Sequence, residues 1–324
     1  MPKKLWILCI ILSIALSGCS TKPQKSDTEK VATEFLLDTV CTIKAGGENA
    51  DEAIESAFLA ISEIQRLTDY YSENSVVSTI NDSPAGRAIK LDDTSFEIIK
   101  TALEVCEKSG GAFDITIAPV SDLWNFKTDT PALPQQIDIN QALTRIGYKK
   151  LYLDTTKKSI TKLAEGVKID LGGVSKGYAA DRSIEILKSF NVDYATVDLG
   201  GNVCVLGKNP ATDDGHFRIG IQAPFQPTGT YSQTVDISGG TVVTSGTYQR
   251  NFKIGNTLYH HIINPADGYP VQNGMASVSI IAESSLLADC LSTACFVLGE
   301  EKGTALAESY HTKILWFGQD GGIK

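Results

Sequence analysis

The chain has 324 residues, with 29 Lys and Arg against 38 Asp and Glu, so its formal net charge is −9. Hydrophobic residues make up 42% of the chain, and aromatic residues make up 8%. This is enough to build a core and excludes disorder as the main state. The acid excess argues against a nucleic-acid partner, because binding to the phosphate backbone needs a surplus of Lys and Arg. The length predicts one large domain or two.

The N-terminus has the pattern of an export signal. Lys3 and Lys4 precede a short apolar stretch, residues 5–16, and the tetrapeptide Leu-Ser-Gly-Cys follows, ending at Cys19. An uncut N-terminal anchor is the alternative, but the apolar run is short for one. The tetrapeptide is similar to a bacterial lipobox, which implies lipidation of Cys19 and a location at the extracytoplasmic face of the cell membrane. The expected organisation is a lipoprotein signal peptide at 1–18, a lipidated tether at 19–32 and a folded domain at 33–324.

The cysteines outside the signal do not form a recognisable framework. They are odd in number and contain no Cys-x-x-Cys pair, which argues against a set of disulfides and against a zinc site. Most have apolar neighbours, so we expect them to behave as small buried hydrophobic residues. They are Cys41, Cys106, Cys204, Cys290 and Cys295.

The apolar spacing predicts strands and helices without a regular alternation. Helices are expected over residues 50–70, 94–109, part of 131–146, 175–190 and 285–298, with a shorter one after these. Strands are expected over residues 33–44, 194–206, 216–237, 241–246, 258–263, 276–281 and 313–317, with a hairpin over 149–169. Runs of strands broken by a few helices are typical of α+β folds. We therefore predict mostly antiparallel sheets with packed helices, in one large domain of two lobes.

The first segment that suggests chemistry is a Gly-rich turn that leads into a helix, Asp-Leu-Gly-Gly-Val-Ser-Lys at residues 170–176. Glycines allow close approach to the backbone, and the first N–H groups of a helix are unpaired, so such a turn can hold a phosphate. Lys176 adds a positive charge. The segment is neither a Walker A loop nor Gly-x-Gly-x-x-Gly, and an ordinary strand-to-helix turn is an equal alternative. A second Asp-Leu-Gly-Gly, residues 198–201, leads into a strand and is not predicted to start a helix.

The second segment is an almost wholly apolar helix, residues 284–298, that carries a carboxylate. Asp289 and Thr293 stand four residues apart and therefore lie on one face of the helix. A carboxylate in apolar surroundings is costly unless it is paired or coordinated. Carboxylate and hydroxyl oxygens suit Mg²⁺ when phosphates complete its shell. The alternative is a buried Asp satisfied by a backbone N–H or a Lys.

The third segment places two histidines side by side before a turn rich in Pro and Gly. His260 and His261 end a predicted strand, and adjacent strand residues face opposite ways. They therefore cannot both serve one site, and zinc is disfavoured. One of them can act as a general base or a phosphate partner. The alternative is one surface His and one core His.

Together with residues 111–119 and 240–248, these segments resemble the ApbE-type family of FAD:protein FMN transferases. The resemblance runs in order from about residue 39 to 298. It implies the ApbE-like fold and transfer of FMN from FAD to a Thr or Ser hydroxyl of an extracytoplasmic protein, with release of AMP. FAD is then a substrate, Mg²⁺ the cofactor, and the acceptor a flavoprotein with a Ser/Thr flavinylation motif. A lipid anchor would attach the enzyme to the membrane.

The resemblance also implies roles for individual residues. Asp289, Thr293 and the main chain of Gly173 match the magnesium ligands, so Asp289 also counts as catalytic. His261 is the candidate that activates the acceptor hydroxyl. The positions that match FAD contacts are Val40, Tyr70, Tyr71, Asn81, Ala112, Phe113, Asp114, Asp170, Lys176 and Ile263.

Two other functions fit the same residues. A magnesium-dependent FAD pyrophosphatase would use water in place of the acceptor hydroxyl and release FMN and AMP. A flavin-binding lipoprotein without turnover would keep FAD intact. The Asp289 and Thr293 pair argues against pure capture, because capture has little need of a metal at a pyrophosphate.

Overall fold

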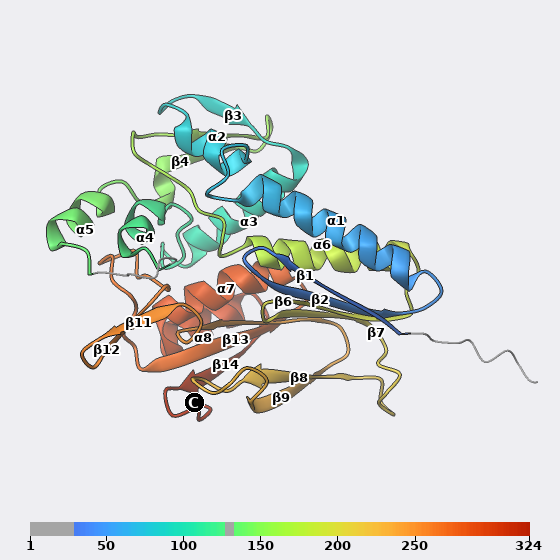
Figure 1. Ribbon diagram of the computed structural model, residues 1–324. Coiled ribbons are helices and arrows are strands. Elements are labelled where there is room, and N and C mark those ends of the chain that lie inside the picture. Colours follow the sequence, from blue (N-terminus) through green and yellow to red (C-terminus); the bar gives the residue numbers. More distant parts are fainter. Residues whose placement is uncertain (1–28, 127–132) are drawn as a thin grey trace, which may run out of the picture.

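The computed structural model describes residues 29–126 and 133–324, so the predicted signal peptide and Cys19 lie outside the described residues. A seven-stranded sheet, in which every neighbouring pair is antiparallel, organises the chain (Figure 1). Its strands, in spatial order, are β1 (Lys30–Leu36), β2 (Thr39–Gly46), β6 (Tyr194–Leu199), β7 (Asn202–Gly207), β10 (Gly240–Gly246), β13 (Met275–Ala282) and β14 (Lys313–Gly318). The predicted α+β class with mostly antiparallel sheets is confirmed.

The segment that was predicted as the first strand lies in a hairpin of two strands, β1 and β2. A single strand over residues 33–44 is wrong, because Leu37 and Asp38 turn the chain between β1 and β2 with φ of 52° and 60°. Leu is rare in this left-handed backbone and no Gly marks the turn, which explains why the pattern hid it. Strand β1 begins at Lys30, so the folded domain takes in residues 30–32 that the prediction assigned to the tether.

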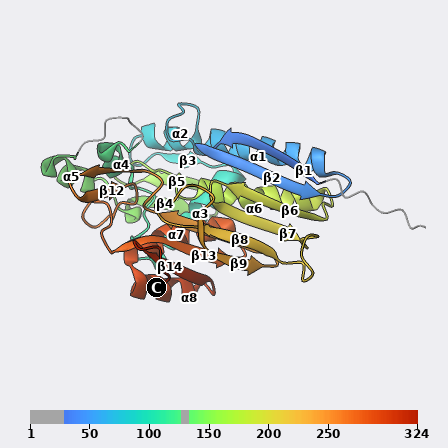
Figure 2. The same ribbon diagram turned by 60° about the horizontal axis from the view of Figure 1, so that its bottom comes forward.

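Helices cover one face of the sheet and a hairpin covers part of the other (Figures 1 and 2). On the helical face, α1 (Ala50–Thr68) and α6 (Ser175–Ser189) share a core with β2, β6 and β7. On the opposite face, β8 (Phe217–Gln222) and β9 (Tyr231–Ile237) pack on side chains from β6, β7, β10 and β14. The alternation of apolar side chains along these strands fills both cores.

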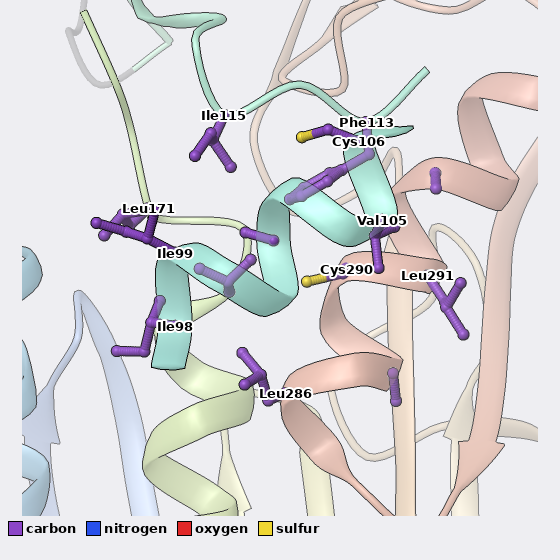
Figure 3. Close-up of a cluster of buried hydrophobic side chains, with 14 of the residues drawn as sticks. Ile98, Ile99, Val105, Cys106, Phe113, Ile115, Leu171, Leu286, Cys290 and Leu291 are labelled. Carbon is purple, nitrogen blue, oxygen red and sulfur yellow. The ribbon is translucent and has the colours of Figure 1, made fainter. Parts of the chain in front are cut away.

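The largest core lies between α3 (Asp93–Lys108) and α7 (Ser285–Leu298), which is followed by α8 (Glu300–Ser309) (Figure 3). The cluster contains Ile98 and Ile99 of α3 and Leu286 and Leu291 of α7, together with the side chains of Cys106 and Cys290. All five cysteines of the described ranges are buried and none is in a disulfide there, so the prediction of buried apolar cysteines is confirmed.

A second lobe is built from the middle of the chain. It contains α2 (Val76–Asp82), a three-stranded sheet in the order β3 (Ala88–Lys90), β5 (Ser159–Lys162), β4 (Leu151–Asp154), and the helices α4 (Ala118–Trp124) and α5 (Gln136–Leu143), with a single 3₁₀ turn at Tyr148–Lys150. The indole of Trp124 donates a hydrogen bond to the carbonyl of Gly268 at 2.8 Å. It also packs on Tyr259 of the hairpin β11 (Asn251–Ile254) and β12 (Thr257–His260), which joins the lobes. The sequence pattern did not predict α2, α4 or β11, which are short.

No helix among the described residues is long and apolar enough to span a membrane.

Candidate active site

A cavity of about 1,580 Å³ opens between the sheet and the segment that carries α4. It collects residues from distant parts of the chain: the β1–β2 turn, the segment at residues 112–126, the Gly-rich turn, one face of α7 and the loops after β8 and β10. Ligand sites commonly reach about 300–1,000 Å³, so this space can hold a dinucleotide and part of a second molecule.

The Gly-rich turn forms one wall of the cavity. The Asp170 carboxylate accepts the Gly172 amide at 2.7 Å, and helix α6 begins at Ser175. Gly173 also lines the cavity, beside the Phe113 ring. The turn therefore presents backbone and the start of a helix to the cavity, as an anion site requires.

The hairpin was predicted to continue to residue 169, just before this turn. That prediction is wrong, because the hairpin of this region ends with β5. Instead, the Asn81 side chain makes the two backbone hydrogen bonds to Ile169 that a neighbouring strand would make. Its Nδ2 donates to the Ile169 carbonyl at 2.9 Å and its Oδ1 accepts the Ile169 amide at 2.7 Å. An amide group matches a peptide unit in donor and acceptor, so one side chain satisfies both backbone groups.

Helix α7 brings its carboxylate to the start of α6. Asp289 is only 4% exposed, and its Oδ2 accepts the Gly177 amide at 2.9 Å and lies 3.7 Å from the Lys176 Nζ. Burial raises the pKa of Asp289 above its usual value, while the Lys176 charge and the Gly177 amide oppose that rise. The alternative of a buried Asp satisfied by a backbone N–H and a Lys is therefore observed, and the same carboxylate also lines the cavity.

The cavity face of α7 offers oxygen ligands. Thr293 lies one turn after Asp289, and its hydroxyl is 3.4 Å from the Ser245 hydroxyl of β10. In the described ranges, no group of three or more His, Cys, Asp or Glu could hold a metal ion. One buried carboxylate, one hydroxyl and main-chain oxygens form a sparse, hard donor set that fits Mg²⁺ with ligand phosphates, and fits zinc poorly.

The two histidines separate as their alternation predicts. His260 is 2% exposed, its Nε2 is 2.7 Å from the Val271 carbonyl, and its ring meets Phe296 edge-on. His261 lines the cavity, and its Nδ1 is 3.4 Å from the Arg250 carbonyl. Burial, together with the positive neighbours, lowers the pKa of His261 far below its usual value, so the cavity imidazole is neutral near pH 7.

Comparison with known proteins decides the family. The chain matches the model of the ApbE family over residues 37–316. The chain belongs to the ApbE family. It is 30% identical over 319 residues to the FAD:protein FMN transferase of Treponema pallidum, across 94% of this chain and 87% of that protein. It is 33% identical over 256 residues to the enzyme of the same name from Klebsiella pneumoniae, across 79% of this chain and 78% of that protein.

Solved ApbE structures share the fold. The crystal structure of the ApbE protein of Thermotoga maritima matches with a TM-score of 0.83 at 32% identity, covering 91% of this chain and 96% of that one. The apo flavinyl transferase ApbE of Pseudomonas stutzeri matches with a TM-score of 0.79 at 28% identity, covering 90% and 92%. The resemblance seen in the sequence is confirmed, as is the expectation that the chain is a transferase enzyme.

Most residues that the ApbE resemblance singled out line this one cavity. They are Val40, Tyr71, Ala112, Phe113, Asp114, Asp170, Gly173, Lys176, His261, Ile263, Asp289 and Thr293. The fold thus brings together side chains separated by up to most of the chain length.

Three of the predicted FAD contacts have other partners. Tyr70 and Asn81 do not line the large cavity, and the Tyr70 hydroxyl donates to the Asp122 carboxylate at 2.7 Å. Asn81 instead supports the Gly-rich turn through its hydrogen bonds to the backbone of Ile169. The Asp114 carboxylate accepts the Thr116 amide at 2.8 Å, the Thr116 hydroxyl and the Tyr148 amide, so it organises its own loop. These ApbE positions therefore shape the walls, and direct contact with a ligand is not needed to explain them.

Several cavity residues were missed from the sequence. Arg250 reaches across to Asp38 of the β1–β2 turn, with Nη2 and Oδ2 2.8 Å apart, and Tyr248 packs edge-on against Phe225. Ser245 and Tyr248 lie in segment 240–248, so its resemblance to the ApbE family is the signal that could have found them, whereas no local pattern marks Asp38 or Phe225. Both lie in turns with positive φ, where Asp is tolerated and Phe is rare.

The contact of α6 with α7 in this ApbE chain depends on Gly177. A Cβ at that position would lie 2.3 Å from the Ser285 carbonyl oxygen and 2.8 Å from the Asp289 Cβ. Alanine normally favours a helix over glycine by about 1 kcal/mol. Here we expect Gly177→Ala to lower the free energy of unfolding by about 1–3 kcal/mol, because backbone blocks the added methyl.

Denaturant unfolding monitored by circular dichroism measures this change. Glu185→Ala, on the exposed face of the same helix, is the matched control and should stay within about 0.5 kcal/mol of wild type. A Gly177→Ala variant as stable as that control would contradict the close packing.

Proposed function

We propose that the chain transfers FMN from FAD to a Ser or Thr hydroxyl of an extracytoplasmic protein, with release of AMP. The observation that carries the proposal is the joining of three elements in one cavity: the Gly-rich turn with Lys176, the Asp289 and Thr293 pair, and the neutral His261. The names of the relatives from Treponema pallidum and Klebsiella pneumoniae support the same reaction.

In the proposed reaction, the acceptor hydroxyl oxygen attacks the phosphorus of the FMN half of FAD. The P–O bond to the AMP half breaks as the new P–O bond forms, and AMP leaves with the bonding electrons. His261 accepts the hydroxyl proton at Nε2, provided that Nδ1 carries the other proton and donates it to the Arg250 carbonyl. Lys176 and the N–H groups at the start of α6 hold the pyrophosphate oxygens in place.

The donor set on α7 fits magnesium. Asp289, Thr293 and a main-chain oxygen at Gly173 would hold the ion, and bound Mg²⁺ would neutralise pyrophosphate charge and polarise its P–O bonds. The chain's own cavity is rich in carboxylates, such as Asp38, Asp122 and Asp170, which repel a pyrophosphate. A cation at Asp289 offsets that repulsion.

The proposal includes the location. Lipidation at Cys19 would leave only the short segment before β1 between the membrane and the folded domain. An extended chain spans at most about 3.5 Å per residue, so the domain would stay within a few tens of ångströms of the bilayer. An acceptor at the outer face of the cell membrane suits that reach.

The test is incubation of the protein with FAD, Mg²⁺ and candidate extracytoplasmic flavoproteins that carry Ser/Thr motifs. We expect the acceptor mass to rise by one FMN group and AMP to appear in equal amount. Release of FMN and AMP without labelling of any acceptor would favour the pyrophosphatase. FAD that stays bound and intact with Mg²⁺ present would favour a flavin-binding protein without turnover.

A further inference from the structure

The carboxylate of Asp181, on α6, caps the first turn of α7. The Oδ1 of Asp181 accepts the Ser285 amide at 2.7 Å, and its Oδ2 accepts the Leu286 amide at 3.0 Å and the Ser284 hydroxyl at 2.8 Å. These amides are the first two of the helix, which have no partner within it. The negative charge also faces the positive end of the helix dipole.

Helix α7 does not need Asp181 in order to have a cap. The Ser284 hydroxyl already accepts the Leu287 amide at 3.3 Å, which is an ordinary N-cap within the helix. The bonds from Asp181 therefore do something that a local cap cannot do, which is to tie α7 to α6.

The tie has a defined geometry. Gly177 and Asp181 stand four residues apart on α6, and Ser285 and Asp289 stand four residues apart on α7. Gly177 meets Asp289 at one point, and Asp181 meets Ser285 at the other. Two contact points, one helical turn apart on each helix, set both the rotation of α7 and its position along its axis. The two helices lie side by side in Figure 1.

We propose that Asp181 is a positioning residue of the pyrophosphate and magnesium subsite, an inference that rests on the proposed function. By holding the first turn of α7, it orients Asp289 and Thr293 toward Gly173 and Lys176 at the start of α6. The carboxylate itself lies outside the cavity lining and touches no reacting atom. Residues that orient metal ligands typically change metal affinity by about 10- to 100-fold when they are removed.

A second acidic cap in the chain supplies the control. Asp92 accepts the Ser95 amide at 2.9 Å and the Ser95 hydroxyl at 2.7 Å, both at the beginning of α3. No residue of α3 lines the cavity among the described residues. Asp92→Ala therefore removes an acidic helix cap without moving the proposed ligands.

The experiment measures ADP binding to the full chain as a function of Mg²⁺ concentration, since ADP carries the pyrophosphate but no transferable flavin. We expect Asp181→Ala to raise the half-saturating Mg²⁺ concentration about 10- to 100-fold and to leave riboflavin affinity within about 2-fold. Asp92→Ala should lower the melting temperature and leave the Mg²⁺ dependence unchanged. Asp181→Asn keeps one acceptor oxygen and should shift Mg²⁺ dependence in the same direction, so it carries the test if the alanine variant does not fold.

The outcomes separate this inference from the proposed function. An Asp181 variant that melts earlier but keeps the wild-type Mg²⁺ dependence overturns the positioning role, as does ADP binding by the wild type that ignores Mg²⁺. Wild-type protein that binds ADP with Mg²⁺ but labels no acceptor contradicts the proposed transfer, while the comparison of Asp181 with Asp92 still decides the positioning role.

Discussion

Replacing Asp289 by Asn is expected to abolish Mg²⁺-dependent flavin transfer while leaving the unliganded fold at least as stable as wild type. The variant keeps an acceptor for the Gly177 amide but loses the charge that a cation needs. Metal-based stabilisation of a phosphoryl transition state is worth several kcal/mol, so transfer should fall by about a thousand-fold or more.

The stability half of this prediction follows from the direction of the pKa shift. Because burial raises the pKa of Asp289, the folded protein binds this proton more readily than the unfolded chain does. The contribution of this carboxyl group to stability is therefore lost as the pH rises from its usual pKa through the raised one. At neutral pH, a neutral amide removes that penalty, and Lys176, whose side chain is 26% exposed, can be hydrated instead.

Two neighbouring hydroxyls provide the matched pair for this site. Thr293→Val should also weaken Mg²⁺-dependent transfer, because it deletes a proposed ligand without changing the shape of the side chain. Ser292→Ala removes a buried hydroxyl that bonds Ser245 at 2.7 Å and lies outside the cavity lining, so transfer should persist. Flavinylation of an acceptor, followed by mass spectrometry at several Mg²⁺ concentrations, measures all three. Normal transfer by Asp289→Asn would contradict the metal assignment.

Loss of the His261 imidazole should slow transfer without preventing FAD binding. General-base catalysis typically contributes about 10²–10⁴-fold, and we expect a decrease of that size for His261→Ala. Since its pKa is lowered, the imidazole is already neutral near pH 7, and its protonation should not reduce the rate between pH 8 and pH 6. Stopped-flow transfer rates over this pH range, beside FAD titration, measure both effects.

The adjacent histidine should behave in the opposite way. His260 is buried and hydrogen-bonded to the Val271 carbonyl, so His260→Gln should lower the melting temperature. The folded fraction of this variant should transfer FMN at close to the wild-type rate. If His261→Ala instead fails to fold or to bind FAD, then His261 is a structural residue and another group must take the proton.

Local patterns in the sequence were sufficient for the long amphipathic elements. Helices such as α1 and α3 show their buried side chains at intervals of three and four, and burial alternates along strand β2. Both periods follow from backbone geometry alone. Short elements, including α2 and β11, carry too few residues for a period to be visible. The turn at Leu37 and Asp38 escaped because its left-handed backbone lacks the glycine that usually marks it.

The charge balance of −9 over 324 residues and the motifs at residues 170–176, 260–261 and 284–298 led, through their resemblance to the ApbE family, to the prediction of a dinucleotide site that needs a cation. Those motifs are local, since each holds a turn or a single helix face. Only the tertiary structure decides that Asn81 completes the backbone of Ile169, that Asp114 serves its own loop and that Asp181 ties α6 to α7. These roles depend on hydrogen bonds between segments far apart in the chain, and such bonds leave no period or spacing in a single sequence.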